Sequence, residues 1–390
     1  MKDALISKAE ALAPEFYELS DYICDHPELG YQEHEACRVL TQRLARSGFQ
    51  VETGVGGIPT AFRATYQHGE GGPSLGLLCE YDALEGLGHA CGHHMQGPAM
   101  LLCAEAIQAV VTDRPYRLVV YGTPAEETAP AKQDMWDNGC FRDIDLALMT
   151  HASYQTATDL SSLASVNLVV TYHGISAHAG MFPEKGRSAF DALQLAFHGV
   201  ELLREHVADD VRMHYTCLDA GSPPNAVPAK AVGKFCLRCR YSFSYLMEVK
   251  ERFLNIVKGA ALMSGVTYEV DEGLTWPNKI PAPFLNEIIM KNAQAVGCPD
   301  LAPPRERPGT TDFAAVMQHV PGCCLRIKYV DPPITSHTPA FAAAGKTDMA
   351  HRSILLSAQA LAGTCWDILH DPSLLEGIRA SYEESCQKYR

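Results

Sequence analysis

The stretch SLGLLCEYDALEGLGHACGHHMQGPAMLLCAEAIQAVV (residues 74–111) contains the clearest succession of an expected strand, a polar loop and an expected helix in the chain. Its first eight residues, 74–81, are mostly apolar and predict a strand. Residues 96–111 are rich in Ala, Met and Leu and predict a helix. The loop between them carries a cluster of metal-binding side chain types, namely His89, Cys91, His93 and His94. A strand, a polar loop and a helix in this order are typical of an α/β protein.

The same alternation extends in both directions from this stretch. Residues 61–66 predict a strand, and residues 116–121 and 144–150 predict continuous apolar strands of the kind found inside buried sheets. Helical spacing covers residues 1–48, with a break at Asp25-His-Pro-Glu-Leu-Gly30, and returns at 284–296 and in a final helix near 347–370. We therefore predict an α/β domain with a mixed sheet covered by helices.

The middle of the chain has a different order of expected strands and helices. Residues 163–276 predict the order strand, helix, strand, strand, helix, strand, which is that of a ferredoxin-like (βαββαβ) unit. The Pro-rich segment 277–283 then leads back to α/β character. A chain of 390 residues is also long for one core, so two domains are expected. We predict an α/β domain formed by 1–162 and 277–390, and an inserted domain at 163–276.

Composition narrows the classes of function. Lys and Arg total 32 against 46 Asp and Glu, a net charge of -14, which argues against a nucleic-acid partner. No apolar run approaches the roughly 20 residues of a membrane span, and the N-terminal residues resemble the start of an amphipathic helix and not a signal peptide. Most of the 14 cysteines are expected to be small buried residues in a reducing compartment, which predicts a cytoplasmic protein. Four lie in apolar runs: Cys79, Cys103, Cys217 and Cys365.

Four separated segments offer metal ligands. Cys91-Gly-His93 combines a thiolate and an imidazole around a glycine that lets the backbone bend. Glu126 and Glu127 follow a buried strand and point in different directions, so one can bind metal while the other acts as a general base. His151 follows the strand at 144–150, and His337 lies in a polar loop. Together they offer about as many groups as a two-metal hydrolytic site uses.

Each of these segments alone is weak evidence for a metal site, because a lone histidine or a Glu-Glu pair is usually structural or solvated. Two motifs that would suggest a serine nucleophile or a redox cysteine pair are weaker evidence still. Gly72-Pro-Ser74-Leu-Gly76 fits the nucleophile-elbow pattern, but a Gly/Pro turn precedes the serine and a strand follows it. Cys236-Leu-Arg-Cys239 has redox spacing but lies within an expected strand. Joint placement of the ligand types at strand ends therefore favours a metal site.

An ordered set of motifs resembles a known family. The set resembles the binuclear metallo-amidohydrolase branch of the aminoacylase and carboxypeptidase family, which includes hippurate hydrolases, indole-acetyl-amino-acid amidohydrolases, aminobenzoyl-glutamate hydrolases and dipeptidase-like proteins. The resemblance covers residues 20 to 370. Its motifs are His26-Pro-Glu-Leu-Gly30, Glu80-Tyr-Asp-Ala-Leu84, Gly88-His-Ala-Cys-Gly-His93, Pro124-Ala-Glu-Glu127, His173-Gly-Ile-Ser-Ala-His178, Pro224-Asn-Ala-Val-Pro228, Gly309-Thr-Thr-Asp-Phe313 and Ser336-His337.

The resemblance implies roles for individual residues. The implied metal ligands are Cys91 (bridging), His93, Glu127, His151 and His337. Glu126 would be the general base and later the proton donor, and Asp82 would orient a ligand histidine. The inserted domain would serve as lid and dimerisation surface, from which His178 would stabilise the oxyanion in a partner subunit's site. Asn225 and Arg238 would bind the substrate carboxylate.

Three positions keep alternatives open. His94 stands where this branch commonly has Asp or Asn, and it could alter the choice of metal or simply pack. Glu80 stands where more distant relatives place a metal-binding histidine, and we expect it to be structural. Arg240 lies on the same expected strand face as Arg238, and strand periodicity cannot separate the two.

The resulting expectation is hydrolysis of the amide bond of an N-acyl amino acid or dipeptide-like substrate. A water held between two divalent metals would have its pKa lowered, and Glu126 would take its proton. Zinc or manganese is expected first, with cobalt or nickel also compatible. We expect a homodimer with no membrane or nucleic-acid partner. The alternative is a non-catalytic relative that binds a small amide.

Overall fold

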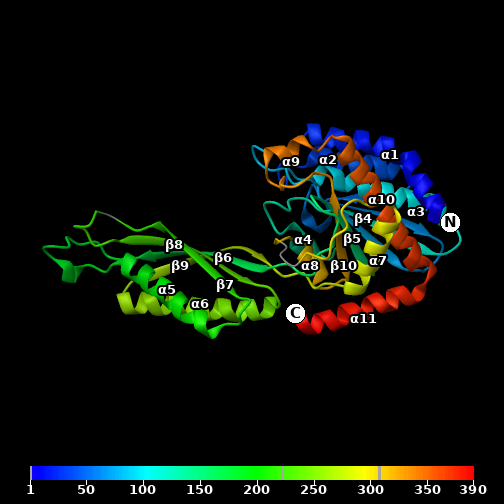
Figure 1. The fold of residues 1–390 in the computed structure, drawn as a ribbon. Helices are drawn as coiled ribbons and strands as arrows, with labels where there is room; N and C mark the ends of the chain where they lie inside the picture. The colour runs from blue at the N-terminus through cyan, green and yellow to red at the C-terminus, as the bar shows by residue number, and fades with distance from the viewer. Residues whose placement is uncertain (1, 222, 306–308) are drawn as a thin grey trace. The chain divides into compact units, whose positions relative to one another are not determined.

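The computed structural model describes residues 2–221, 223–305 and 309–390. The chain folds into two compact units: Met1–Ser161 with Lys279–Gln387, and Ser162–Asn278 with Lys388–Arg390. Each unit is described separately below (Figure 1). Among the described residues, no helix combines the length and the hydropathy needed to span a bilayer.

The first unit contains a six-stranded mixed sheet in the order β1-β2-β4-β3-β5-β10. Its strands are β1 (Gln50–Thr53), β2 (Phe62–His68), β3 (Ser74–Cys79), β4 (Tyr116–Gly122), β5 (Leu146–Ser153) and β10 (Gly322–Lys328). β1 and β2 are antiparallel, as are β2 and β4, whereas β4, β3, β5 and β10 run parallel. The predicted mixed sheet is therefore confirmed, and the carboxyl ends of four neighbouring strands meet at one edge.

Helices cover both faces of this sheet. On one face α2 (His34–Arg46), α3 (Gln96–Val110) and α10 (Asp348–His370) contact the strands, α1 (Lys2–Asp25) packs on α3 and α10, and α7 (Pro283–Ala295) packs on α10. On the other face α4 (Ala131–Asp137) and α8 (Phe313–Met317) share a core with the strands. α9 (Pro339–Ala343) and α11 (Pro372–Tyr389) complete the helices. Burial on both faces explains why β4 reads as an unbroken apolar run.

Several short or late elements differ from the sequence prediction. β1 has four residues and little burial, and α4, α8 and α9 are too short to show a helical period. The helix near 347–370 is not the final one, because α11 follows it directly. β5 continues through His151 to Ser153, so this histidine lies within the strand and not after it.

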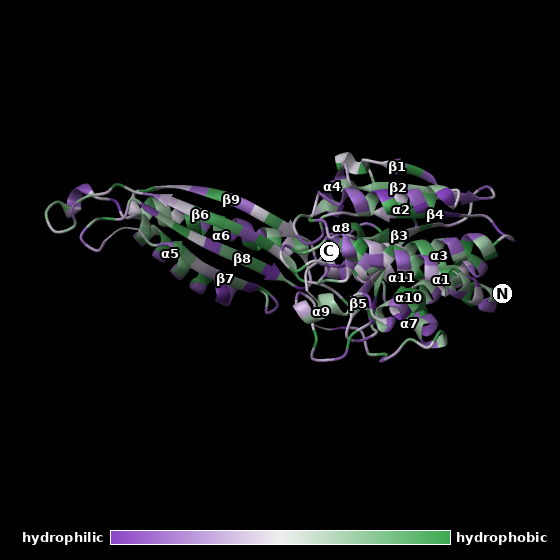
Figure 2. Ribbon diagram, turned by 90° about the horizontal axis from the view of Figure 1, so that it is seen from above, coloured by the Kyte–Doolittle hydropathy of each residue, from purple (hydrophilic) through white to green (hydrophobic). Residues whose placement is uncertain are grey.

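The second unit has the element order β6 (Ala164–His173), α5 (Ala189–Leu203), β7 (Arg212–Asp219), β8 (Lys230–Cys239), α6 (Phe243–Ser264), β9 (Thr267–Trp276). Its four strands pair antiparallel in the order β7-β8-β6-β9. α5 and α6 bury one face of this sheet. Buried residues alternate with more exposed ones along β8, as expected for a sheet covered on one face, and Figure 2 shows hydrophobic and hydrophilic residues mixed along this strand.

The role of this unit as a ferredoxin-like lid and dimerisation domain remains a prediction.

The cysteines correct one sequence expectation. Cys217 lies exposed on the edge strand β7, whereas Cys79, Cys103 and Cys365 are buried. All 14 cysteines are among the described residues, and each is a free thiol.

Candidate metal centre

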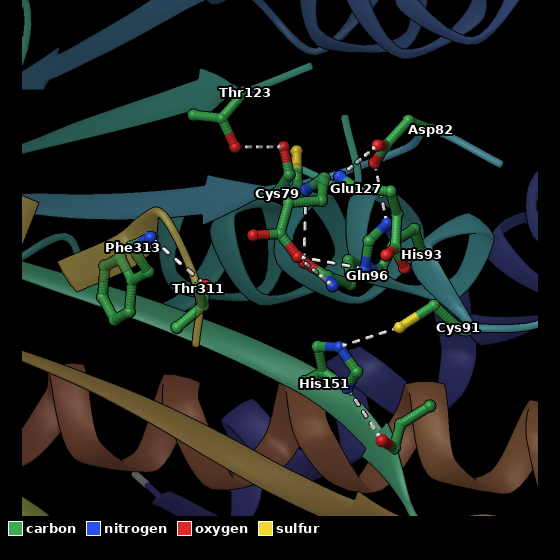
Figure 3. A network of polar contacts seen from close by, with 12 residues as sticks. Cys79, Asp82, Cys91, His93, Gln96, Thr123, Glu127, His151, Thr311 and Phe313 are labelled. Atoms are coloured by element: carbon green, nitrogen blue, oxygen red, sulfur yellow. Dashed lines mark hydrogen bonds and ion pairs between the residues drawn. The ribbon is translucent and has the colours of Figure 1, made fainter. Parts of the chain in front are cut away.

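The predicted ligands of the first unit come from the carboxyl ends of its parallel strands. Cys91 and His93 follow β3, Glu126 and Glu127 follow β4, His151 lies near the end of β5, and His337 lies in the loop after β10. Open α/β sheets bind their ligands at this edge. Figure 3 shows Cys91, His93, Glu127 and His151 directed toward one another from separate segments.

The Cys91–His93 turn depends on the glycine between the two residues. Gly92 has φ 82°, and a Cβ at this position would lie 2.5 Å from the Cβ of Ala152. Both the left-handed conformation and the close approach favour glycine. Burial raises the pKa of the Cys91 thiol to about 12, so this thiol must lose its proton when it binds a metal.

His93 is oriented by a carboxylate. Its Nδ1 lies 2.8 Å from Oδ1 of Asp82, while its buried Nε2 forms no hydrogen bond and lies 3.4 Å from Oε2 of Glu80. An acceptor on Nδ1 fixes the hydrogen there and leaves the Nε2 lone pair available, as in many metal-binding histidines. Burial lowers the pKa of His93, but the charges of Cys91 and Asp82 outweigh it and raise that pKa well above its ordinary value.

His151 is oriented by the backbone. Its Nδ1 lies 2.8 Å from the carbonyl oxygen of Ala152, and its Nε2 lies 3.5 Å from Sγ of Cys91. Burial, with contributions from Arg326 and His93, holds the pKa of His151 well below its ordinary value. A neutral imidazole with Nε2 directed at a thiol has the form that metal ligation requires.

The Glu126–Glu127 segment is held in an uncommon backbone conformation. Ala125 has φ 59°, and its N–H donates to Oε1 of the buried Glu33 at 2.7 Å. The backbone N–H of Glu127 donates to Oδ2 of Asp82 at 2.9 Å. A non-glycine residue at positive φ persists only where its surroundings impose it, and such residues cluster at functional sites.

His337 completes the outer side of the cluster. Its backbone also has positive φ, 64°, and its N–H donates to the carbonyl of Ala90 at 2.8 Å. The Nε2 of His337 lies 3.3 Å from Oε1 of Glu127. The loop after β10 is thus tied to the loop that carries Cys91.

The six side chains form one continuous cluster. Three overlapping sets have ligand atoms within 4.8 Å of one another: Cys91, His93 and His151; Cys91, Glu127 and His337; and His93, Glu126 and Glu127. The buried Nε2 of His93 and Oε1 of Glu127 both lack hydrogen bonds. Thiolate, imidazole and carboxylate donors fit transition-metal ions. The residues present therefore fit a divalent metal centre.

A fourth set of potential ligands consists of carboxylates alone, and a lysine of the same chain supplies a cation beside it. Glu80, Glu126 and Asp312 also offer oxygens within 4.8 Å of one another. The ammonium of Lys132, 0% exposed, donates to Oε1 of Glu80 at 2.7 Å and to Oδ1 of Asp312. Sequence reasoning missed Lys132 and assigned no role to Asp312. Asp312 lies in one of the family-like motifs, whereas nothing in the sequence distinguishes Lys132 from a surface lysine.

Glu80 has the contacts of a supporting residue. Its Oε2 accepts the side-chain amide of Gln96 at 2.8 Å, and its N–H donates to Oε1 of Gln96 at 3.1 Å. Burial raises the pKa of Glu126 well above its ordinary range, and the nearby charges of Glu80 and Asp312 raise it further. Such a shift suits a group that must accept and return a proton near neutral pH.

His94 packs away from the ligand sets. It is fully buried, and its Nε2 lies 2.9 Å from the carbonyl oxygen of Gly345. The ring of His89 lies 5.1 Å from that of His94 between centroids. Neither histidine belongs to a set of potential ligands among the described residues. Of the two alternatives for His94, the geometry favours packing.

The remaining predicted site residues belong to the second unit. The N–H of Ala179 donates to the carbonyl of Asn225 at 2.9 Å, and His178 forms a β-bridge with Ala226, so these two segments run side by side. Arg238 lies on β8, and its Nε donates to Sγ of Cys236 at 3.3 Å. β8 ends at Cys239, so Arg240 lies beyond the strand and does not share its face.

Comparison with known proteins identifies the class. The model of peptidase family M20/M25/M40 matches residues 76–353, and the chain belongs to this family. The resemblance inferred from the motifs is confirmed. Named relatives of the chain are peptidases and amidohydrolases, and the chain is a hydrolytic enzyme. Family membership supports a metal-dependent amide hydrolase.

Individual relatives span nearly the whole chain. The Xaa-Arg dipeptidase of Homo sapiens is 32% identical over 95% of this chain and 89% of its own length. A p-aminobenzoyl-glutamate hydrolase subunit from Escherichia coli is 28% identical over 96% of this chain and 93% of its own length. Two solved structures share the fold: a putative aminohydrolase from methicillin-resistant Staphylococcus aureus (TM-score 0.81, 21% identity, 95% and 100% coverage) and a dinuclear metal-binding peptidase from Bacillus subtilis (0.74, 16%, 93% and 99%).

Proposed function

We propose that this enzyme hydrolyses the amide bond of an N-acyl amino acid or a dipeptide-like substrate. The observation that carries the proposal is the convergence of Cys91, His93, Glu127, His151 and His337 around Glu126, with the buried Nε2 of His93 left without a hydrogen bond. The names of the relatives, a dipeptidase and an aminobenzoyl-glutamate hydrolase, support small amide substrates.

Two divalent ions, zinc or manganese first, would be held by these five ligands. When bound, they would polarise the amide carbonyl and lower the pKa of water at the site. The structural neighbour from Bacillus subtilis is a dinuclear metal-binding peptidase, and this likeness supports two ions here. Cobalt and nickel are compatible with the same donor atoms.

Glu126 would move the protons of the reaction. Its carboxylate would accept a proton from the attacking water and return it to the departing nitrogen, so that one group serves as base and then as acid. Asp82 would keep His93 and Glu127 in place during this transfer. No hydrogen bond engages the Glu126 carboxylate among the described residues, so it is available for both steps.

His178, Asn225 and Arg238 would act from the second unit. His178 would stabilise the developing oxyanion, a contribution of roughly 3–4 kcal/mol for one such donor. Asn225 and Arg238 would bind the substrate carboxylate, which a guanidinium can grip with two hydrogen bonds. We also propose a cytoplasmic homodimer in which His178 serves the partner's site.

A metal-content measurement combined with an amide panel tests this function. The panel holds N-acyl amino acids and dipeptides and is run with added zinc, manganese, cobalt or nickel. Hydrolysis that a chelator abolishes and one of these ions restores is the expected result. Protein that carries no divalent metal, or activity that survives chelation, would refute the proposal. Protein that binds metal and amide but hydrolyses nothing would be the non-catalytic relative.

Mixed dimers test the placement of His178. A His178→Ala subunit and a Glu126→Gln subunit each lack one required group. If sites are shared, the mixture regains part of the wild-type activity, because one of its two sites receives both intact groups. Mixtures that stay as inactive as either parent would show that each subunit is self-contained.

A further inference from the structure

Lys132 is a buried charge that the proposed chemistry does not use. It lies at the start of α4, five residues after Glu127, and its side chain is 0% exposed. A lysine is almost never fully buried unless it is paired, because removing an unpaired charge from water is costly. Its ammonium is held by two carboxylates, Glu80 and Asp312.

The contacts of Lys132 join three separate segments. Its Nζ donates to Glu80 after β3, while both its Nζ and its backbone N–H, at 3.0 Å, donate to Asp312 before α8. Glu80 is further fixed by two hydrogen bonds with Gln96 of α3. The lysine is therefore clamped in one position from both its backbone and its side chain.

The third carboxylate of this cluster is Glu126. Its oxygen lies within 4.8 Å of oxygens of Glu80 and Asp312, so three carboxylates meet around one ammonium. Lys132 engages two of them by hydrogen bonds, and Glu126 is left without one among the described residues. The same Glu126 also belongs to the outer set with His93 and Glu127.

We propose that Lys132 is a positioning residue that supplies a permanent cation to the Glu80–Glu126–Asp312 cluster. Its ammonium occupies the place that a further divalent ion would take, holds Glu80 and Asp312, and leaves Glu126 as the carboxylate free for proton transfer. The part of this inference that concerns Glu126 rests on the proposed function. The part that concerns the cation does not.

Metal stoichiometry tests the cation directly, without an activity assay. Lys132→Ala removes the ammonium and opens space beside three carboxylates, which suit a divalent ion. We expect it to bind one more manganese ion per subunit than wild type, measured by elemental analysis after equilibrium dialysis. Lys132→Met fills the same space with an apolar chain and should bind as many ions as wild type.

Lys279→Ala is the matched control for this measurement. Lys279 is also a buried lysine, 3% exposed, but its Nζ lies 2.9 Å from Asp159, a carboxylate that Arg305 and Arg326 also contact. Its removal should add no ion. The proposal that the Lys132 ammonium takes the place of a divalent ion would be refuted by either of two results. One is a Lys132→Ala protein with the wild-type ion content, and the other is an extra ion in Lys279→Ala as well.

Kinetics of metal-loaded Lys132→Met test the effect on Glu126. We expect kcat to fall at least about tenfold, a fraction of the usual worth of a general base, with KM within about threefold of wild type. Lys132→Arg, which keeps the charge, should have a higher kcat than Lys132→Met. Wild-type kcat in the methionine variant, or equal kcat values for the two variants, would overturn the positioning role.

A double variant covers the case in which Lys132→Met does not fold. Lys132→Met/Asp312→Asn removes one carboxylate with the cation, and it should fold with the same loss of kcat. Wild-type kcat in this double variant would refute the positioning role.

Failure of the proposed function can be told apart from failure of this inference. If the wild-type enzyme hydrolyses no amide, the proposed function fails, while manganese binding by Lys132→Ala still tests whether the Lys132 ammonium takes the place of a divalent ion.

Discussion

Asp82 holds two candidate metal ligands at once: its Oδ1 lies 2.8 Å from Nδ1 of His93, and its Oδ2 accepts the backbone N–H of Glu127 at 2.9 Å. The two ligands follow different strands, β3 and β4. One buried carboxylate therefore fixes the distance between the side chain of one ligand and the backbone of the other.

The Asp82→Asn variant should bind metal about 10- to 100-fold more weakly, the usual cost of losing a partner that orients a ligand. The amide is neutral, and it cannot accept at both atoms. Competition with a chromogenic chelator measures the affinity. Asp113→Asn, which changes a surface carboxylate paired with Arg114, should leave the affinity unchanged. Equal affinities for Asp82→Asn and wild type would show that His93 is oriented without Asp82.

Glu126→Gln should keep its metal and lose at least about a hundredfold in turnover, because a general base contributes this much or more. Its neighbour provides the contrast. Glu127→Gln should lose metal affinity first, since Glu127 belongs to two of the three potential ligand sets that contain a histidine, whereas Glu126 belongs to one. Elemental analysis and single-substrate kinetics on both variants separate these roles. Near wild-type turnover in Glu126→Gln would mean that another group is the base.

Glu33→Gln should stabilise the metal-free protein at pH 8 but not at pH 4. Burial raises the pKa of Glu33 to about 7, although its hydrogen bonds with Ala125 and Thr60 oppose this. Because the folded state holds the proton more tightly than the unfolded state, stability falls as pH rises from the unfolded pKa to the folded one. The glutamine removes this loss, at most about 3 kcal/mol, and keeps an acceptor for Ala125.

Thermal unfolding of Glu33→Gln and wild type between pH 4 and pH 8 measures this effect. The melting temperatures should agree at the acidic end and diverge toward pH 8, with the variant higher. A constant difference across the range would show that Glu33 does not titrate between its unfolded pKa and pH 8.

Asp159→Asn should destabilise the first unit by about 3–5 kcal/mol at pH 7, because it leaves buried cations without their partner. Asp159 accepts from Lys279 at 2.9 Å and from Arg305 at 2.8 Å, and lies 3.4 Å from Arg326. Burial raises its pKa, but these three charges outweigh burial and hold that pKa below its ordinary value. Its contribution is therefore complete above the unfolded pKa of about 3.9 and is lost as pH falls below it.

Urea unfolding at pH 7 and pH 3.5 measures the loss in Asp159→Asn. The difference from wild type should be smaller at the lower pH. Asp300→Asn is the control, because Asp300 pairs with Lys328 at the surface, and exposed pairs contribute about 0–1 kcal/mol. A loss in Asp159→Asn no larger than in this control would show that the buried cations find other partners.

The sequence predicts those helices and strands whose apolar run or helical spacing of apolar residues extends over enough residues to be recognised. The apolar run of β4 and the helical spacing of α3 are of this kind. β1 is four mostly exposed residues whose place depends on pairing with β2, and α4 and α8 are too short for a period. α11 follows α10 after a single residue, so the spacing gives no reason to expect a second helix there.

The candidate ligands can be picked out in the sequence because most of them are cysteine or histidine and because all of them lie near or beyond the ends of strands. Lys132 is different, since its burial results from where Glu80 and Asp312 meet, and these residues are far from it in sequence. Glu33 likewise acts on Ala125, 92 residues away. Such pairings become visible only when the sheet brings the segments together.

The position of β10 has a consequence for the order of events on the ribosome. This edge strand pairs with β5, yet the whole second unit is synthesised between them. Until β10 emerges, β5 presents an unpaired edge, a known hazard for misassociation, and His337 has not been made. Because domains fold as units during synthesis, the second unit can fold before the first can close. Assembly of the candidate metal centre is then among the last steps, because His337 belongs to the part of the first unit that is synthesised after the second unit.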